Sequence, residues 1–245
     1  MSRLRQRLTE DLELAGDSER TQEVYVRSVR QLAKHYGRSP DLLTEDEVRS
    51  YFVRIRDVKR SARSSITIAL CGLKFFFEKT LQREWRVFEI ARPPRQSRLP
   101  AVLTREEVQR VLAAVRNDTY RACLTTMDAC GLRLSEGAFL RVADIDGARR
   151  TVHVVHGKGG RDRYVPLPHG LLDLLRRHWK AHRSQEWLFP APKSGPEARA
   201  PVGRSSLQTA LRRAVKASRI RKKAHVHTLR HSYATHLLEA GVTSG

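Results

Sequence analysis

A histidine and an arginine near the end of the sequence are spaced for phosphate chemistry. His227 and Arg230 open the run HTLRHSYATHLL, residues 227–238, whose apolar residues repeat at helix spacing. Positions i and i+3 share one face of a helix, so both side chains can point at one target. A guanidinium offers a planar fork of N–H donors and an imidazole can transfer a proton, a combination that suits a phosphate oxygen. An ordinary helix start with a solvated arginine explains the same two residues, and the pair alone does not decide between these interpretations.

Two more basic residues lie in segments that suit a phosphate site. Arg133, in GLRLSE, is expected at a helix start, where Glu136 can pair with it or with a backbone donor. Lys158 lies in GKGG, between β-like runs at 151–156 and 161–167, which predicts a hairpin with this lysine at its tip. The GxxxxGK[ST] pattern of a Walker loop is absent. A local ion pair and a solvated turn are the simpler explanations.

Residues 1–90 have the pattern of a helical domain. Apolar residues at helix spacing predict helices over 4–14, 25–36, 44–55 and 66–81. Gly16 and Gly37 end the first two, and Thr44 with Glu47 forms a capping box before the third. Before the fourth lies a basic, hydroxyl-rich segment that could hold DNA phosphates or be a solvated loop, and its cations are Lys59, Arg60 and Arg63.

A proline-containing basic segment separates this domain from a second one. Residues 91–103 contain Arg95 and read as an extended linker. A second capping box at 104–107 opens residues 104–245, where we expect a buried helix leading to GLRLSE, the hairpin, an amphipathic helix over 171–182 and another around 207–215. The last of these leads into a basic run that we expect to face DNA, comprising Arg221, Lys222 and Lys223.

The charge balance points to a polyanionic partner. The 245 residues carry 47 Lys and Arg against 26 Asp and Glu, a formal net charge of +21, which favours nucleic acid. An anionic membrane is the competing partner, but no apolar run is long enough to span a bilayer. The odd set Cys71, Cys123 and Cys130 predicts buried thiols in a reducing compartment, with the cytoplasm as the default.

Arg133, Lys158, His227 and Arg230, in this order and this two-domain setting, resemble the tyrosine recombinases of the phage integrase family. The resemblance implies a mainly α fold with a small β-hairpin sheet, arranged as a two-domain DNA clamp. A SAM-like core-binding domain would span 1–90, a linker 91–103 and an integrase-type catalytic domain 104–245. Members of this family cut and rejoin DNA through a 3′-phosphotyrosine link, without a metal or other cofactor.

The same resemblance assigns roles to individual residues. Arg133 and Arg230 would clamp the scissile phosphate, and Lys158 would protonate the leaving 5′-oxygen. His227 would hydrogen-bond the phosphate or assist proton transfer from the nucleophile. Glu136 would support the arginines, and His231 lies nearby with an open role.

The sequence departs from the family pattern after Arg230. Neither the second His or Trp motif nor the nucleophilic tyrosine is found before Gly245, so we expect a chain that stops before its nucleophile and binds DNA without cleaving it. Tyr233 has helix spacing typical of a packed aromatic residue rather than a nucleophile. The expected partners are double-stranded DNA and full-length protomers of the family, with a monomer off DNA and no membrane.

Two alternatives belong to other functional classes. One is a non-catalytic protein that occupies recombination sites. The other is a metal-dependent nuclease, which ranks low because no HExxH or acidic cluster is present. Its candidate ligands would be His153, His156, His225, His227 and His231 with Asp144 or Asp146.

Overall fold

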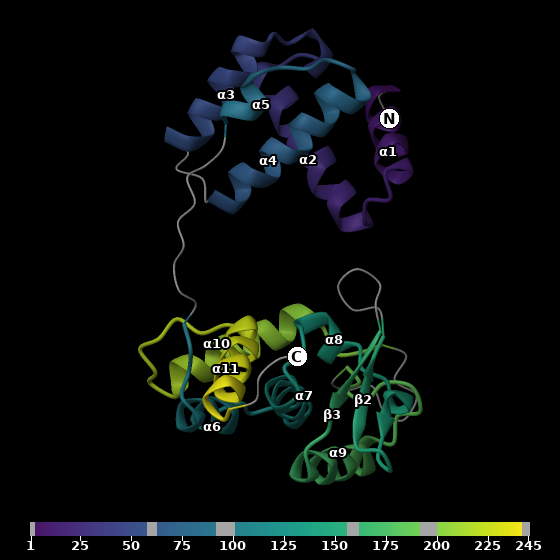
Figure 1. The fold of residues 1–245 in the computed structure, drawn as a ribbon, viewed down its shortest axis with the longest axis vertical. Coiled ribbons are helices and arrows are strands. Elements are labelled where there is room, and N and C mark those ends of the chain that lie inside the picture. The colour runs from purple at the N-terminus through teal and green to yellow at the C-terminus, as the bar shows by residue number, and fades with distance from the viewer. Residues whose placement is uncertain (1–2, 58–62, 92–100, 156–161, 192–199, 242–245) are drawn as a thin grey trace. The chain divides into compact units, whose positions relative to one another are not determined.

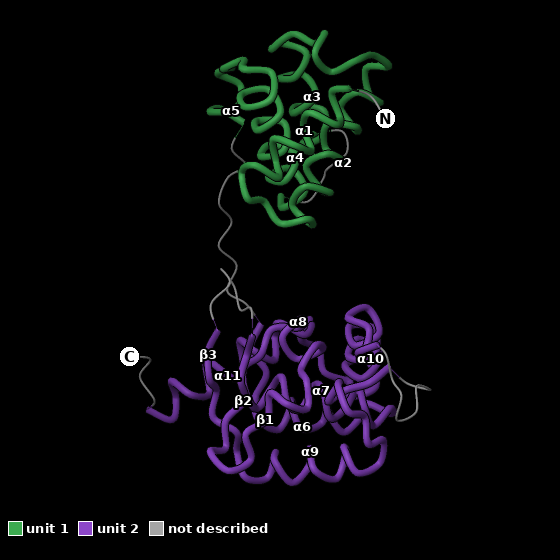
Figure 2. Tube along the Cα trace, turned by 90° about the vertical axis from the view of Figure 1, so that its right-hand side faces the viewer, with its two compact units in different colours: residues 1–97 green, residues 98–245 purple. Residues whose placement is uncertain are grey.

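The computed structural model describes residues 3–57, 63–91, 101–155, 162–191 and 200–241. The chain divides into two compact units, residues 1–97 and residues 98–245 (Figure 2). Lys59, Arg60, Arg95, His156 and Lys158 lie outside the described residues.

The first unit is helical, and its helix ends are set by local sequence. Ser18 caps one helix, and Gly37 closes it in the left-handed conformation at φ 66°. The capping box at Thr44 is confirmed, since the Glu47 carboxylate accepts the Thr44 backbone N–H at 2.8 Å. The elements are α1 (Arg3–Leu14), α2 (Glu19–Tyr36), the 3₁₀ turn η1 (Pro40–Leu42), α3 (Glu45–Asp57), α4 (Arg63–Phe75), the π turn η2 (Phe76–Thr80) and α5 (Val87–Ile90).

Two details of this unit correct the sequence predictions. The helix expected over 66–81 is α-helical only to Phe75, and the chain then widens into η2, where the Leu81 N–H donates to the Phe76 carbonyl at 3.0 Å. Phe76 and Phe77, in this wider turn, are buried in the core of the unit. Cys71 is exposed rather than buried, because it lies on a solvent-facing position of α4.

The second unit is mainly helical with a small sheet at one side, which confirms the predicted fold class (Figure 1). Its capping box at Thr104 and Glu107 is also confirmed. The elements are α6 (Arg105–Ala113), α7 (Asp118–Ala129), α8 (Leu134–Ala138), the 3₁₀ turn η3 (Val142–Asp144), β1 (Ile145–Asp146), β2 (Thr151–Val154), β3 (Arg163–Pro166), α9 (His169–His182), α10 (Arg204–Ala217) and α11 (Val226–Glu239).

The predicted hairpin is present as the antiparallel pair of β2 and β3, with Val152 opposite Val165. The short strand β1, which the sequence pattern did not predict, adds to the other side of β2. Val152 and Val165 are buried, and their face of the sheet joins the core of the unit. The hairpin therefore has a fixed register from Thr151–Pro166 at its base to Val154–Arg163, the described pair nearest the connecting loop.

Helix α7 lies at the centre of the second unit and contacts α6, α8, α9, α10 and α11. Its residues Cys123, Leu124 and Met127 are fully buried, and Cys123 and Cys130 are buried as predicted. Burial raises the pKa of both thiols, that of Cys130 to about 12, so these cysteines are inert at neutral pH.

Helix α11 is fixed to the start of the unit by a buried hydrogen-bond pair. The Ser232 hydroxyl accepts the Leu103 backbone N–H and donates to the Thr228 carbonyl, both at 2.9 Å. One turn on, the His236 imidazole lies 3.0 Å from the Leu103 carbonyl. In the described ranges, none of the helices combines the length and the hydropathy that crossing a bilayer requires.

Candidate functional site

A buried carboxylate, Glu136, is the centre of the candidate site. Its side chain is 5% exposed. One oxygen accepts Arg133 Nη1 at 2.7 Å and the other accepts the Arg133 backbone N–H at 2.7 Å. The sequence allowed Glu136 to pair with Arg133 or with a backbone donor, and the structure shows both bonds.

Arg133 is positioned by a sharp turn between α7 and α8. The chain leaves α7 through Gly131, whose φ of +57° is accessible to glycine at little cost. Arg133 then takes an extended conformation as the N-cap of α8, with Glu136 at the third helical position. This is the helix start predicted from GLRLSE, and it leaves the Arg133 side chain 34% exposed.

Arg163, at the start of β3, is a site residue that the sequence analysis missed. Its guanidinium binds both oxygens of Glu136, at 2.9 and 2.7 Å. A signal for it existed, because residues i and i+2 share one face of a strand and Arg163 therefore faces the same side as the buried Val165. A charged residue on the inward face of a strand needs a buried partner.

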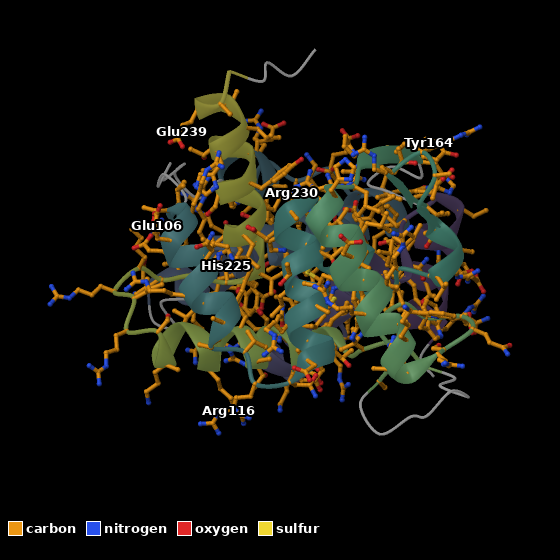
Figure 3. The ribbon with its side chains drawn as sticks, turned by 90° about the horizontal axis from the view of Figure 1, so that it is seen from below. Glu106, Arg116, Tyr164, His225, Arg230 and Glu239 are labelled. Atoms are coloured by element: carbon orange, nitrogen blue, oxygen red, sulfur yellow. The ribbon has the colours of Figure 1, made fainter. Side chains whose placement is uncertain are left out.

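Arg230 reaches the same cluster from α11. Its guanidinium donates to the Gly131 carbonyl, and its Nη1 lies 3.9 Å from Glu136. Figure 3 shows it between α11 and α7. Burial is the main cause that lowers the Arg230 pKa from its ordinary value, and the positive charge of Arg133 lowers it further.

Three guanidinium groups therefore surround one carboxylate, which leaves a local excess of two positive charges. Although burial opposes ionisation, hydrogen bonds from Arg163 and Arg133 lower the Glu136 pKa to about 2, so Glu136 is charged at neutral pH. Arg133, Arg163 and Arg230 each keep about a third of the side chain exposed. The cluster is thus able to accept an anion from solvent.

His227 lies beside these cations and is exposed to solvent. Although the residue as a whole is exposed, partial burial of its imidazole is the largest cause that lowers its pKa. The neighbouring His225, His231, Arg230 and Arg133 lower the pKa further. A lowered pKa keeps the imidazole neutral at pH 7, so it can accept or donate a hydrogen bond at a phosphate oxygen. His231 is exposed on the same helix.

Tyr233 packs into the turn that carries Arg133. A Cβ placed on Gly131 would lie 2.4 Å from Tyr233 Cδ1, so the ring covers the glycine backbone directly. Burial raises the pKa of its hydroxyl. This packing agrees with the structural role predicted for Tyr233. Tyr164, 67% exposed, lies at the outer edge of the unit and away from Arg230 (Figure 3).

The remaining predicted DNA contacts are distributed over both units. Arg63 is exposed at the start of α4, and Arg221 and Lys223 are exposed between α10 and α11. Lys222 instead forms an ion pair with Glu107 at 2.7 Å. Its positive charge is therefore partly neutralised by the capping carboxylate of α6.

Three candidate ligands of the nuclease alternative, Asp144, Asp146 and His153, have separate partners. Asp144 accepts the Arg141 backbone N–H and Asp146 that of Arg149, each at 2.8 Å. His153 pairs with Asp162 at 3.4 Å. Across the described residues, no group of three or more His, Cys, Asp or Glu side chains is arranged to hold a metal ion.

Both units match known family models. Residues 101–244 match the model of the phage integrase family, and residues 4–87 match that of the phage integrase N-terminal SAM-like domain.

Similar proteins extend over nearly the whole chain. The protein y4qK of Sinorhizobium fredii, whose name assigns it provisionally to the integrase/recombinases, is 42% identical over 98% of this chain and 77% of its own length. An integrase/recombinase of Escherichia coli is 33% identical over 91% of this chain and 77% of its own. The tyrosine recombinase XerA of Thermococcus kodakarensis is 32% identical over 94% and 79%.

Solved structures share the fold. A λ integrase fragment, in a dimer bound to a COC′ core site, has a TM-score of 0.76 at 16% identity and covers 97% of this chain and 89% of its own. A Tn1549 transposon integrase in complex with circular intermediate DNA has a TM-score of 0.73 at 16% identity, with coverage of 98% and 88%.

Proposed function

Because this chain belongs to the phage integrase family of tyrosine recombinases, we propose that its second unit binds a phosphate of duplex DNA between Arg133 and Arg230. One observation carries this proposal. Two arginines from distant segments, the turn before α8 and the helix α11, reach the same carboxylate, at 2.7 and 3.9 Å from Glu136. Folding thus assembles a partly exposed pair of guanidinium groups whose combined charge exceeds that of their internal partner.

The geometry suits the transition state of phosphoryl transfer. Attack on a phosphodiester places additional negative charge on the equatorial oxygens, and preorganised guanidinium groups stabilise that charge without reorganising. Arg133 and Arg230 would bind these oxygens, and the neutral imidazole of His227 would donate or accept a hydrogen bond beside them. The general-acid role of Lys158 remains a prediction from the family resemblance.

DNA is the partner that the charge distribution favours. The net charge of +21 supplies attraction to a polyanion. Exposed cations occur in both units, with Arg63 in the first and Arg221 and Lys223 in the second. The λ and Tn1549 integrases, which share this fold, are bound to DNA in their structures. We propose that residues 1–90 act as a core-binding domain, 91–103 as a linker and 104–245 as the unit that holds the phosphate.

The packing of Tyr233 favours binding without strand cleavage by these 245 residues. Its ring is held against Gly131, which opposes the movement that an attack on a phosphate would require. We therefore propose that Tyr233 is not the nucleophile. The second candidate function is therefore that of a protein that occupies recombination sites without cleaving the DNA.

A nicked suicide duplex analysed on two gels tests the proposal. A native gel reports binding, and a denaturing gel reports a covalent protein–DNA link. We expect a shift that weakens with salt and no covalent band. Arg133→Gln and Arg230→Gln should each weaken binding about ten-fold, the equivalent of about 1.4 kcal/mol, whereas Arg176→Gln on the remote helix α9 should not.

Two results would contradict the proposal. Absence of any shift at low salt would refute DNA binding. A covalent band that disappears in Tyr233→Phe would show that Tyr233 attacks the phosphate. Gel filtration without DNA should give a monomer, and a stable tetramer would contradict that expectation.

A further inference from the structure

We propose that Arg163 is a positioning residue, which saturates Glu136 and thereby keeps Arg133 and Arg230 available for the DNA phosphate. The inference rests on the proposed function and extends it. It concerns a residue that contacts neither DNA nor the reacting atoms in the proposed arrangement, and that acts through Glu136.

The hydrogen bonds divide the arginines into two kinds. Arg163 makes two side-chain bonds to Glu136, one to each oxygen, at 2.9 and 2.7 Å. Arg133 makes one side-chain bond, and Arg230 makes none, since its nearest nitrogen is 3.9 Å away. A bidentate arginine–carboxylate pair is the strongest arrangement available to these groups. Among side-chain donors, Arg163 is therefore the main partner of Glu136, and Arg133 adds one side-chain bond and its backbone N–H.

Removal of Arg163 would turn Glu136 into a competitor of DNA. The carboxylate is 5% exposed and ionised, and without Arg163 each of its oxygens keeps only one hydrogen bond, from Arg133 Nη1 or from the Arg133 backbone N–H, in a poorly solvated place. Its nearest remaining donors are Arg133 and Arg230. Both guanidinium groups would be drawn toward the carboxylate, and the phosphate would have to displace it.

A purely architectural role for Arg163 is less well supported. The strand β3 that carries it is already held by register pairs with β2 from Thr151–Pro166 to Val154–Arg163. Val165 anchors the same strand in the core, where it is 9% exposed. The sheet thus has its own hydrogen bonds and apolar contacts, and the ion pair with Glu136 adds little that the strand lacks.

Variants that remove and then rebalance charge distinguish a positioning role of Arg163 from a purely structural role in the 245-residue chain. Binding of a short fluorescein-labelled duplex is measured by anisotropy for the wild type, Arg163→Gln, Glu136→Gln and the double variant. The glutamine at 136 keeps a carbonyl that can still cap α8. Thermal unfolding of every variant by circular dichroism shows whether it is folded under the assay conditions.

Two control variants match the charge changes far from the site. Arg176 and Asp173 form an exposed pair on α9, which lies at the opposite edge of the unit from α8 in both views (Figures 1 and 2). Arg176→Gln removes one positive charge without touching Glu136. Asp173→Asn, combined with Arg163→Gln, restores the net charge of the chain while leaving Glu136 ionised.

We expect Arg163→Gln to weaken binding about ten-fold, or about 1.4 kcal/mol, and Arg176→Gln to change it less than about two-fold. Adding Glu136→Gln to Arg163→Gln should restore binding, and adding Asp173→Asn should not. The inference is overturned if Arg163→Gln resembles Arg176→Gln, if Glu136→Gln gives no rescue, or if both second changes rescue equally. A wild-type chain that fails to bind refutes the proposed function, and the inference falls with it.

Discussion

Replacing Gly131 by alanine should destabilise the second unit through two separable effects. At φ +57° a side chain costs ~1–2 kcal/mol in left-handed backbone strain. The new Cβ would also lie 2.4 Å from Tyr233 Cδ1 and 2.6 Å from Cε1, which forces the ring or the turn to move. Overpacking of this kind costs ~1–3 kcal/mol, so the total is about 2–5 kcal/mol.

Urea unfolding measures this loss. Trp179 and Trp187 lie in the second unit and Trp85 in the first, so a Trp85→Phe background reports the second unit by fluorescence. With a slope of about 2 kcal/mol per molar urea, the midpoint should fall by roughly 1–2.5 M. Since the Gly131 carbonyl accepts a hydrogen bond from Arg230, DNA binding should weaken as well.

A matched glycine isolates the strain from the overlap. Gly37 has φ +66°, and a Cβ added there would meet nothing within 4 Å, so Gly37→Ala should cost only the strain, in the first unit. Tyr233→Ala should recover part of the Gly131→Ala loss in a double-mutant cycle. A midpoint shift below about 0.5 M for Gly131→Ala, or strict additivity with Tyr233→Ala, would refute the packing argument.

Three further outcomes are expected. Ser232→Ala leaves a buried backbone N–H without its acceptor and should lower the free energy of unfolding by ~1–3 kcal/mol, measured by urea titration, whereas Ser232→Thr should lose less. Burial lowers the His178 pKa to about 4, below its value in the unfolded chain, so the native state binds fewer protons than the unfolded state. The free energy of unfolding should therefore be highest above pH ~6.5 and should fall as the pH drops toward 4. The fall should be at most ~3 kcal/mol, and smaller than that because the ring is partly exposed. His178→Asn should flatten this profile, and an unchanged profile would contradict it. Because Lys222 is paired with Glu107, Lys222→Met should reduce the slope of log K against log salt less than Lys223→Met, and equal slopes would show that DNA breaks the pair.

Sequence patterns predicted those features whose causes are local. Thr104 and Glu107 lie three residues apart and together form the capping box of α6. Gly37 ends α2 because its backbone adopts the left-handed conformation, a preference set by the residue type itself. The arginine at position 133 was predicted at a helix start for the same reason. Periodicity could not reveal the widening into η2, because the same apolar residues satisfy an α-helical pattern.

The site itself depends on contacts that no local pattern encodes. Arg163 meets Glu136 across 27 residues of sequence, and Arg230 meets the Gly131 carbonyl across 99. His227 and Arg230 were placed on one helix correctly, and their binding of a common phosphate stays a prediction. Arg163 was missed because an arginine in a short strand is usually solvated. Its spacing from Val165 indicated the inward direction, but its partner Glu136, 27 residues away, is identified only by the fold.

The attachment of Leu103 to α11 limits where this protein can exchange parts with its relatives. Leu103 is fully buried, its N–H is held by Ser232 and its carbonyl by His236. A recombination event that joined a foreign N-terminal module after residue 103 would replace Leu103 by a residue that did not evolve to pack against α11. A crossover on the N-terminal side of Val102 would keep the whole anchor within one parental sequence. A splice point that keeps this anchor intact therefore lies ahead of Leu103, the first buried residue of the second unit in the part from residue 101 that the structure describes.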